Sequence, residues 1–339
     1  MKVLVTGGAG YIGSVTVERL LDEGHEVLVI DNLSTGNRNA VHPSAQFVNC
    51  DLKNQRDLLS STIKEFKPGA VIHLAANSLV GESVTDPFKY IDDNVNNALN
   101  LIKECIDNTI PKFILSSTAN IFGNSNSLID ETHEISPGSP YGESKYIIER
   151  HLKTLSGIYE WFDYVTLRYF NAAGATAFFG EVRDNETHLI PLILDVAEGK
   201  RDKIQIYGDT YSTDDGTCIR DYIHVEDIAL GHILSLQEKI KNREYNLGIG
   251  KGYSVKEVIA TVEKVTGKSI TSEIVDKREG DPDYLVCDSQ KALDELYWIP
   301  RYKDLESIIK TAWSWRLIYP LGYKDYTLSY ANREIMQHL

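Results

Sequence analysis

Residues 2–13, Lys-Val-Leu-Val-Thr-Gly-Gly-Ala-Gly-Tyr-Ile-Gly, decide the fold of this chain. Val3, Leu4 and Val5 form an apolar run long enough for a buried strand, and a cluster of glycines follows at once. From Ile12 onward the apolar residues take helical spacing, so the stretch predicts a strand, a glycine turn and a helix. Such a turn presents backbone N–H groups at the positive end of a helix, where a pyrophosphate fits.

The spacing of the glycines separates two classes of nucleotide site. Gly8, Gly10 and Gly13 fit the dinucleotide fingerprint Gly-x-Gly-x-x-Gly. A P-loop needs Lys and Ser/Thr directly after its last glycine, whereas Ser14 and Val15 follow here, which argues against hydrolysis of a nucleoside triphosphate.

An acidic residue follows at the distance that a dinucleotide site requires. Asp31 ends the next predicted strand, 18 residues after Gly13. A carboxylate there accepts hydrogen bonds from a ribose diol and repels a 2′-phosphate, which favours NAD over NADP. The alternative for Asp31 is a loop cap. Asp51 ends the third predicted strand and is either an adenine contact or a turn former.

Composition excludes several classes of partner. The 339 residues predict one large domain and one smaller domain. The net charge of −14 argues against nucleic-acid and anionic-membrane binding, since both need a basic surface. The four cysteines have no Cys-x-x-Cys spacing, no apolar run reaches membrane-spanning length, and the chain starts directly in a strand without room for a signal peptide. We therefore expect a cytoplasmic protein with reduced thiols.

Predicted strands and helices alternate through the first half of the chain. Strands are expected at 3–6, 27–30, 46–49, 70–74, 112–115 and 164–169, with helices at about 11–23, 55–66, 87–108 and from about 140. Strands spaced by helices pair in parallel through right-handed crossovers, which predicts an α/β fold with a Rossmann-like doubly wound parallel sheet.

After Asn171 the rhythm breaks and predicts a smaller mixed α/β domain. Its expected elements include helices at 190–198, 225–239, 254–266 and 305–316, and short strands at 204–206, 245–247 and 271–275. Residues 320–339 show no clear apolar period and predict a loosely held tail.

Tyr141 and Lys145 are the candidate catalytic pair. They lie four residues apart and therefore share one face of the helix expected from Pro140, which Ser139 would cap. This helix follows the fifth strand, so its start lies beside the carboxyl edge of the sheet, where the ligand crevice forms. An ammonium near a phenol lowers the phenol pKa and makes a usable base. Thr118 ends the fifth strand, where its hydroxyl would relay a proton or cap a turn.

The second half supplies candidate phosphate ligands. Arg220 and Arg278 carry guanidinium groups that suit phosphate oxygens, although acidic neighbours also allow salt bridges. Tyr207 would stack on a base or pack in the core. The nine histidines show no metal-ligand spacing, so we assign no metal.

Several of these motifs, taken in order, resemble one family. The segments are Thr6–Gly13, Asp31-Asn32-Leu33, Ser116-Ser117-Thr118, Tyr141-x-x-x-Lys145 and Arg168-Tyr169-Phe170-Asn171. They resemble the extended short-chain dehydrogenase/reductases. Further segments resemble the UDP-hexose 4-epimerase branch of that family: Val80-Gly81-Glu82-Ser83, Asp93-Asn94-Val95-Asn96, Asp215-Gly216-Thr217, Arg220–Val225 and Arg278-Glu279-Gly280-Asp281. The match runs from Val3 to about Trp315.

The resemblance implies an NAD-dependent isomerase that interconverts UDP-glucose and UDP-galactose by transient oxidation at C4. It implies NAD contacts at Gly7, Gly10, Tyr11, Ile12, Gly13, Asp31, Asn32, Asp51, Leu52, Leu74, Ala75, Ala76, Asn94, Ser116, Tyr141, Lys145 and Phe170. It implies catalytic roles for Thr118, Tyr141 and Lys145, and contacts to the UDP-sugar at Thr118, Asn171, Leu189, Tyr207, Arg220, Arg278 and Asp281. The NAD domain would span 1–171 with returning segments near 221–250, and the UDP-sugar domain 172–220 and 251–339. Self-pairing of helices 87–108 and 141–157 would give a homodimer.

The chain departs from the family pattern at a few positions. Thr118 stands where Ser is common, Phe122 where Tyr is common, and Ser78 where some members have Lys. Leu285 replaces a bulkier Tyr that narrows the sugar pocket of glucose/galactose enzymes, so the N-acetylhexosamine pair would also fit.

Two other functions remain open at this point. A nucleotide-sugar 4,6-dehydratase or decarboxylase shares the fold, but dehydratases carry an acid pair after Thr118, where this chain has Ala119 and Asn120. A non-catalytic NAD-binding regulator could keep the glycine turn without Tyr141 and Lys145, both of which this chain retains.

Overall fold

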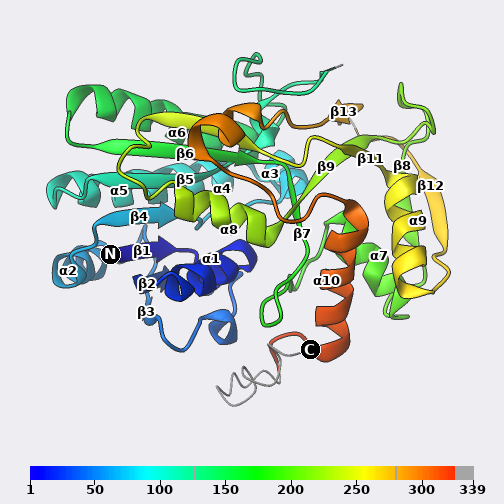
Figure 1. Ribbon diagram of the computed structural model, residues 1–339, viewed down its shortest axis with the longest axis horizontal. Helices are drawn as coiled ribbons and strands as arrows, with labels where there is room; N and C mark the ends of the chain where they lie inside the picture. Colours follow the sequence, from blue (N-terminus) through cyan, green and yellow to red (C-terminus); the bar gives the residue numbers. More distant parts are fainter. Residues whose placement is uncertain (126, 279–280, 325–339) are drawn as a thin grey trace.

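A seven-stranded parallel sheet forms the centre of the larger part of the molecule (Figure 1). The structure is a computed structural model that describes residues 1–125, 127–278 and 281–324. The strand order is β10-β6-β5-β4-β1-β2-β3. The strands are β1 (Lys2–Thr6), β2 (Glu26–Asp31), β3 (Gln46–Asn49), β4 (Ala70–His73), β5 (Lys112–Thr118), β6 (Asp163–Tyr169) and β10 (Arg243–Leu247).

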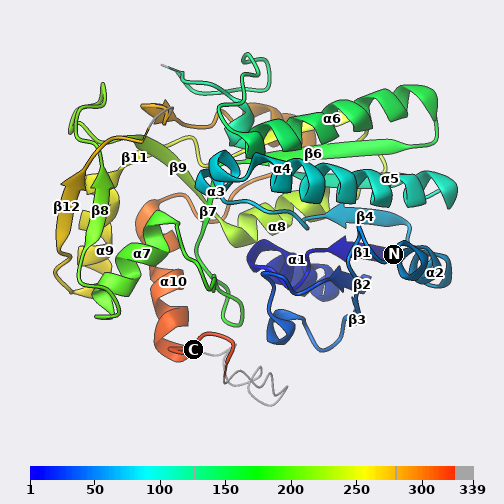
Figure 2. The same ribbon diagram turned by 180° about the vertical axis from the view of Figure 1, so that it is seen from behind.

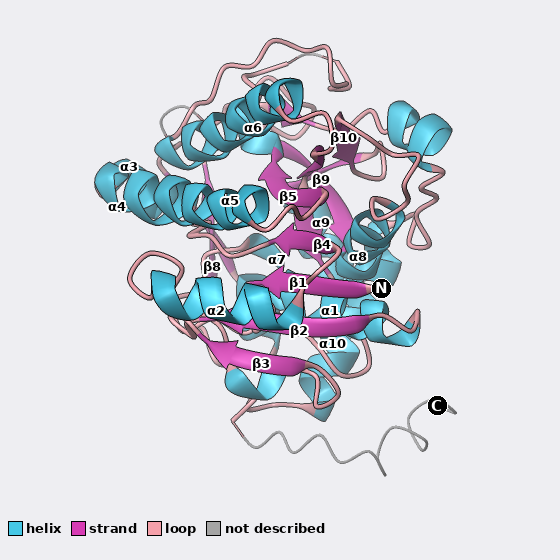
Figure 3. Cartoon of the chain, turned by 90° about the vertical axis from the view of Figure 1, so that its left-hand side faces the viewer, coloured by secondary structure: helices cyan, strands magenta, loops and turns pink. Residues whose placement is uncertain are grey.

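Helices cover both faces of this sheet, as the alternation of side chains along β1 requires (Figure 3). Val3 and Val5 pack on one face with α1 (Tyr11–Asp22) and α8 (Val225–Leu234). Leu4 points to the opposite face, which packs against α2 (Arg56–Phe66), α5 (Asn97–Asp107) and α6 (Pro140–Ile158). The predicted doubly wound α/β fold is therefore confirmed.

A smaller mixed unit lies beside the sheet (Figure 2). In it, β9 (Ile219–His224) pairs in parallel with β7 (Asn171–Ala173) and β13 (Tyr284–Leu285), and antiparallel with β11 (Gly252–Ser254). A second pair joins β8 (Ile204–Tyr207) to β12 (Ser272–Val275). Its helices α7 (Leu189–Ala197), α9 (Val255–Thr266) and α10 (Leu305–Ile318) enclose an apolar core of their own.

The structure corrects three of the predicted elements. Residues 87–108 are not one helix but α4 (Pro87–Tyr90), a π-helical turn (Ile91–Asn96) and α5, and a short helix α3 (Val80–Thr85) precedes them. The helix expected at 225–239 ends at Leu234. The predicted tail does not start at 320, because Tyr323 is buried and exchanges two hydrogen bonds with the backbone of Gly180.

Residues 325–339, the remainder of that predicted tail, lie outside the described part of the chain. None of the described helices is both long and apolar enough to cross a membrane.

Candidate active site

The turn after β1 has the backbone that an anion site needs. Gly7 has a φ of +76°, in the left-handed region that favours glycine. A Cβ on Gly13 would lie 2.0 Å from the carbonyl oxygen of Gly7, so this position admits no side chain. Gly10 caps α1 without a side-chain hydrogen bond, which leaves the first N–H groups of the helix open to a ligand. These features fit the pyrophosphate of NAD.

Asp31 lies at the end of β2, beside this turn. Its Oδ2 accepts a hydrogen bond from the Ala9 N–H (3.0 Å), and its Oδ1 accepts one from the Leu33 N–H (2.8 Å). Burial raises the pKa of Asp31, and these two N–H groups partly offset the rise. The predicted loop cap is thus present, and lone pairs remain for a ribose diol. Asn32 donates to Asp51 (3.0 Å), which joins the two residues predicted on the adenosine side.

The end of β4 lies against the glycine turn. A Cβ on Gly7 would come within 2.5 Å of the Ala75 nitrogen, so the predicted cofactor segment Leu74-Ala75-Ala76 lines the same turn. Asn94, in the π-helical turn, accepts from the Asn77 N–H (2.8 Å) and donates to the Ser144 hydroxyl (3.0 Å). Asn94 therefore links the cofactor side of the cleft to α6.

Leu52 differs from the other predicted cofactor residues in its surroundings. Its side chain is buried in the core cluster beneath α2 and α5, and its carbonyl accepts a hydrogen bond from Asn100 (3.1 Å). The structure thus gives the Leu52 side chain a packing role.

Helix α6 brings Tyr141 and Lys145 to the carboxyl end of β5. Ser139 caps the helix by accepting from the Gly142 N–H (3.2 Å), and Pro140 occupies the first turn, as predicted. Tyr141 is 8% exposed and Lys145 1%. Thr118, the last residue of β5, is also buried and hydrogen-bonds the Tyr141 phenol.

The groups that influence the Tyr141 phenol include one that the sequence did not indicate. Burial raises the Tyr141 pKa, while the Thr118 hydrogen bond and the positive charge of Arg183 lower it. Lys145 instead donates to the carbonyl oxygen of Ser116 (2.9 Å). Burial lowers the pKa of Lys145 to about 8, against the opposing charge of Glu149. Arg183 is thus a charged group near Tyr141 in addition to the predicted Lys145.

Thr118 makes the predicted turn cap, and its hydroxyl lies beside Tyr141 as the predicted proton relay requires. Its Oγ1 accepts hydrogen bonds from the backbone and the side-chain nitrogens of Asn120, each at 3.1 Å, and so caps the turn after β5. A hydroxyl that accepts two hydrogen bonds still has its proton to donate, and it donates toward Tyr141.

The predicted UDP-side residues gather on β8, β9 and the loop before β13. Arg220 forms a salt bridge with Asp281 (2.5 Å), and the Arg278 guanidinium lies 3.8 Å from the centre of the Tyr207 ring. The arginines thus adopt the alternative of an ion pair or ring contact within the group predicted to hold UDP. Asn171 donates to the carbonyl of Asp221 (2.8 Å).

Leu189 is the first residue of α7, directly after the cap His188. Its backbone N–H lies in the first turn of that helix, where backbone N–H groups without a partner inside the helix suit an anion.

Comparisons with known proteins show which family the chain resembles. The model of the NAD dependent epimerase/dehydratase family matches residues 3–248. The UDP-glucose 4-epimerase of Halalkalibacterium halodurans is 44% identical over 329 residues, which cover 95% of this chain and 98% of that protein.

Solved structures agree. A crystal structure of a UDP-glucose 4-epimerase superposes with a TM-score of 0.91 at 44% identity, covering 96% of this chain and 100% of that one. The UDP-glucose 4-epimerase from Brucella ovis, solved in complex with NAD, has a TM-score of 0.88 at 42% identity over 92% of this chain and 97% of that one.

This chain belongs to the NAD-dependent epimerase/dehydratase family. The membership confirms the resemblance to extended short-chain dehydrogenase/reductases and the dependence on NAD. The glycine turn, Asp31 and the paired Asn32 and Asp51 are the residues of this chain that fit that cofactor.

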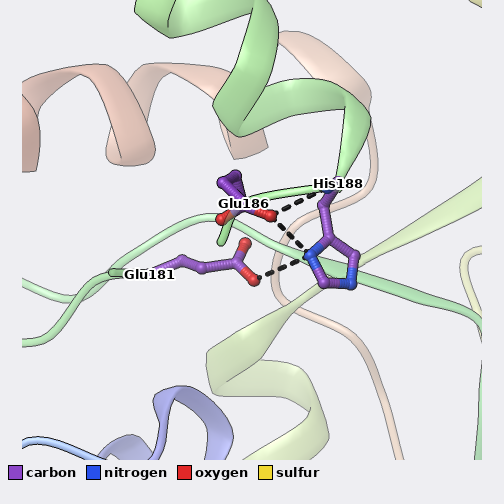
Figure 4. A group of neighbouring side chains, drawn as sticks. All are labelled: Glu181, Glu186 and His188. Atoms are coloured by element: carbon purple, nitrogen blue, oxygen red, sulfur yellow. Dashed lines mark hydrogen bonds and ion pairs between the residues drawn. The ribbon is translucent and has the colours of Figure 1, made fainter. Parts of the chain in front are cut away.

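The loop between β7 and α7 holds a charged cluster that the sequence did not predict. His188 Nδ1 lies 2.7 Å from Glu186 and 3.3 Å from Glu181 (Figure 4). Arg183 pairs with Glu181 at 2.9 Å. Desolvation lowers the His188 pKa, but the hydrogen bond with Glu186 and the charge of Glu181 outweigh it, so the pKa is raised. The loop has no periodic pattern that would have marked these residues.

Among the residues that the structure describes, this cluster is the one whose side chains could hold a metal ion. Glu181, Glu186 and His188 each offer a ligand atom within 4.8 Å of the others. Arg183 pairs with Glu181, and the two carboxylates favour the protonated form of His188. The cluster is therefore explained as an ion-pair network beside the cleft.

Two departures from the family pattern lie together. Phe122 and Leu285 are both buried in one apolar cluster, which also contains Phe170, the residue predicted to contact NAD. This cluster is apolar throughout, because Phe122 lacks the hydroxyl that a tyrosine would bring.

Proposed function

We propose that this protein is a UDP-hexose 4-epimerase that interconverts UDP-glucose and UDP-galactose with NAD. The observation that carries the proposal is the group of Thr118, Tyr141 and Lys145, buried at the carboxyl end of β5 beside the glycine turn. This group occurs in a chain 44% identical, over nearly its whole length, to UDP-glucose 4-epimerases.

The residues of the chain divide the chemistry among them. Tyr141 takes the proton of the sugar 4-hydroxyl, directly or through Thr118, whose hydroxyl already bonds the phenol. NAD, when bound, supplies reversible acceptance of the C4 hydride. Arg183 stabilises the phenolate form of Tyr141 by its charge.

The smaller unit would hold the UDP half of the substrate. We propose that Arg220, Arg278, Tyr207, Asn171 and Leu189 bind UDP and that the sugar stays free to turn and present its other face. The same proposal assigns NAD binding to residues 1–171 with segments near 221–250, and UDP-sugar binding to 172–220 and 251–339. The guanidinium groups of Arg220 and Arg278, which are held beside Asp281 and Tyr207, support this division.

Incubation of the purified protein with UDP-galactose and no added NAD tests the function. UDP-glucose should form, because the cofactor is reduced and reoxidised within one turnover. A protein that holds no NAD and forms no UDP-glucose even with NAD supplied would reject the proposal.

The two positions after Thr118, where dehydratases carry an acid pair, hold no acid in this chain. Ala119 is buried and carries no acid, and the Asn120 side chain is engaged with Thr118. A 4-keto-6-deoxy product from UDP-glucose or a related nucleotide sugar would overturn this view and favour the dehydratase.

We also propose that the N-acetylhexosamine pair is accepted. Leu285 is smaller than the tyrosine that closes the pocket in glucose/galactose enzymes, and it lies in the same cluster as Phe122. Comparison of kcat/KM for UDP-galactose and UDP-N-acetylgalactosamine measures this directly.

A homodimer through the α4–α5 and α6 region is a further part of the proposal. Phe88 and Val84 are 84% and 63% exposed, and the nearby Val80 and Ile91 are also exposed apolar residues. Surfaces of this kind mark interaction sites. Light scattering that finds a monomer at micromolar concentration would contradict the proposed dimer.

We also propose a cytoplasmic location, which the four free cysteines support.

A further inference from the structure

Tyr323, which follows helix α10, joins two segments that lie far from it in the sequence. Its side chain is buried, and its hydroxyl donates to the Gly180 carbonyl (2.9 Å) and accepts from the Gly180 N–H (3.1 Å). Its own carbonyl accepts a hydrogen bond from the Asn39 side chain (2.9 Å). Tyr323 therefore ties the end of the smaller unit to the loop after β7 and to the loop after β2.

Packing fixes the position of Tyr323 as well. The centre of its ring lies 5.5 Å from that of Trp315 on α10, in an apolar cluster that also contains Val15 of α1. Gly322 has a φ of +63°, and a Cβ there would lie 2.8 Å from a methyl group of Val182. The glycine thus allows the chain to turn closely over the loop after β7, which brings Tyr323 to its partners.

Asn39 continues the contact to the glycine turn. Its N–H donates to the side chain of Asn37 (2.9 Å), and the N–H of Asn37 donates to the carbonyl of Ala9 (2.9 Å). The N–H of Ala9 in turn donates to the Asp31 carboxylate (3.0 Å). A path of hydrogen bonds therefore runs from the Tyr323 carbonyl to the carboxylate predicted to bind the ribose of NAD.

The segment 36–40 packs directly on the cofactor turn. A Cβ on Gly36 would lie 2.9 Å from the Ala9 Cβ and 3.0 Å from Asp31 Oδ1. Apart from one 3₁₀ turn (Arg38–Ala40), residues 32–45 have no regular secondary structure. Segments without a regular hydrogen-bond ladder open at a low free-energy cost, so tertiary contacts decide how long this one stays closed. Asn39 and Tyr323 supply such a contact.

We propose that Asn39 and Tyr323 are positioning residues for the cofactor, which hold residues 36–40 against the glycine turn and thereby slow the release of NAD. The inference rests on the proposed function, because an epimerase that reoxidises its cofactor within each turnover gains from keeping it bound. It predicts that the lifetime of bound NAD depends on a residue beyond the last helix of the smaller unit.

Two substitutions test the proposal by the rate at which NAD leaves. Tyr323→Phe removes the hydroxyl that bonds both backbone groups of Gly180, and Asn39→Ala removes the other contact at an exposed position. Protein loaded with ¹⁴C-labelled NAD is diluted into excess unlabelled NAD, and the retained label is followed by rapid gel filtration. Each variant should release the label roughly fivefold faster or more, the factor that one lost hydrogen bond corresponds to.

Tyr253→Phe is the matched control. The Tyr253 hydroxyl is also buried and accepts from a backbone N–H, that of Leu305 at the start of α10 (3.2 Å), within the core of the smaller unit. Its loss should lower the melting temperature and leave the release of NAD at the wild-type rate. Lowered melting temperatures with wild-type release in Tyr323→Phe and Asn39→Ala would show that both residues are merely structural and would overturn the proposal.

The measurement needs no sugar nucleotide, so it is independent of turnover. If Tyr323→Phe does not fold, Asn39→Ala decides alone, because its side chain is exposed and contributes little to the core. A wild type that keeps NAD but forms no UDP-glucose rejects the proposed function and not this inference. Unchanged release in the variants, or a wild type that exchanges NAD within the dead time of the filtration, rejects this inference.

Discussion

Removal of a single hydroxyl, in Tyr141→Phe, separates catalysis from folding. The ring is 8% exposed and its hydroxyl bonds Thr118. Phenylalanine keeps the ring volume and loses that one hydrogen bond, which costs about 1 kcal/mol of unfolding free energy. The cofactor turn lies on another element and is untouched, so the variant should fold and carry NAD.

The loss of turnover should be much larger. A positioned general base contributes roughly 10²- to 10⁴-fold to a rate, which corresponds to about 3 to 5 kcal/mol of transition-state stabilisation. The kcat on UDP-galactose should therefore fall at least about a hundredfold, with a small change in melting temperature.

The assay follows UDP-glucose formation, bound NAD and thermal unfolding on the same preparation. Tyr146→Phe, on the same helix but outside the catalytic group, is the matched control and should keep wild-type kcat. A Tyr141→Phe enzyme that retains a tenth or more of kcat would refute the assignment of the base. Loss of folding or of bound NAD would refute the separation of roles.

Other positions give independent tests. Gly13→Ala should yield protein without bound NAD, measured by absorbance after denaturation, because its Cβ would lie 2.0 Å from the Gly7 oxygen. Leu285→Tyr should lower kcat/KM for UDP-N-acetylgalactosamine at least about tenfold more than for UDP-galactose, since a filled pocket rejects the larger sugar. Asp221→Asn should cost about 1 to 3 kcal/mol in denaturant unfolding, because its carboxylate accepts from three backbone N–H groups and an amide leaves at least one unsatisfied. The raised pKa of His188 predicts stability that is fully present below its unfolded pKa of about 6.5 and is lost as pH rises through the higher folded value. His188→Asn should therefore differ most from wild type at low pH; a pH-independent difference in unfolding free energy would contradict it.

Elements with a local signal were predictable from the sequence. The strand, glycine turn and helix at the start of the chain follow from apolar spacing and from positions that admit no side chain. The start of α6 follows from Ser139 and Pro140, whose capping chemistry is independent of the rest of the fold.

The end of α8 depended on a distant residue. The apolar period continues through Leu236 and Ile240, both of which are buried in the core, and it predicts a longer helix. Lys112, at the start of β5, donates to the carbonyls of Gln237 and Ile240. Those carbonyls are therefore directed to a side chain more than 120 residues away in the sequence, and no local pattern reports that.

The catalytic site shows the same division. Tyr141 and Lys145 were recognisable because they share a helix and a motif. Arg183 was not, because it lies in an irregular loop whose course depends on the packing of the smaller unit. The sequence also did not reveal that Lys145 donates to a backbone carbonyl, since a carbonyl leaves no residue signature.

The buried cluster of Phe122, Phe170 and Leu285 extends this reasoning to pairs of substitutions. Phe122 and Leu285 are separate departures in the sequence, yet they pack in one cluster with Phe170. Residues in contact couple by about 0.5 to 3 kcal/mol, so their effects on specificity cannot be added. Leu285→Tyr introduces a ring against Phe122, and overpacking costs about 1 to 3 kcal/mol unless the neighbour yields. Phe122→Ala should therefore recover part of the stability that Leu285→Tyr loses, in a double-mutant cycle followed by thermal unfolding. Additive changes in unfolding free energy would mean that the two side chains do not interact, and the size of the sugar pocket would then depend on Leu285 alone.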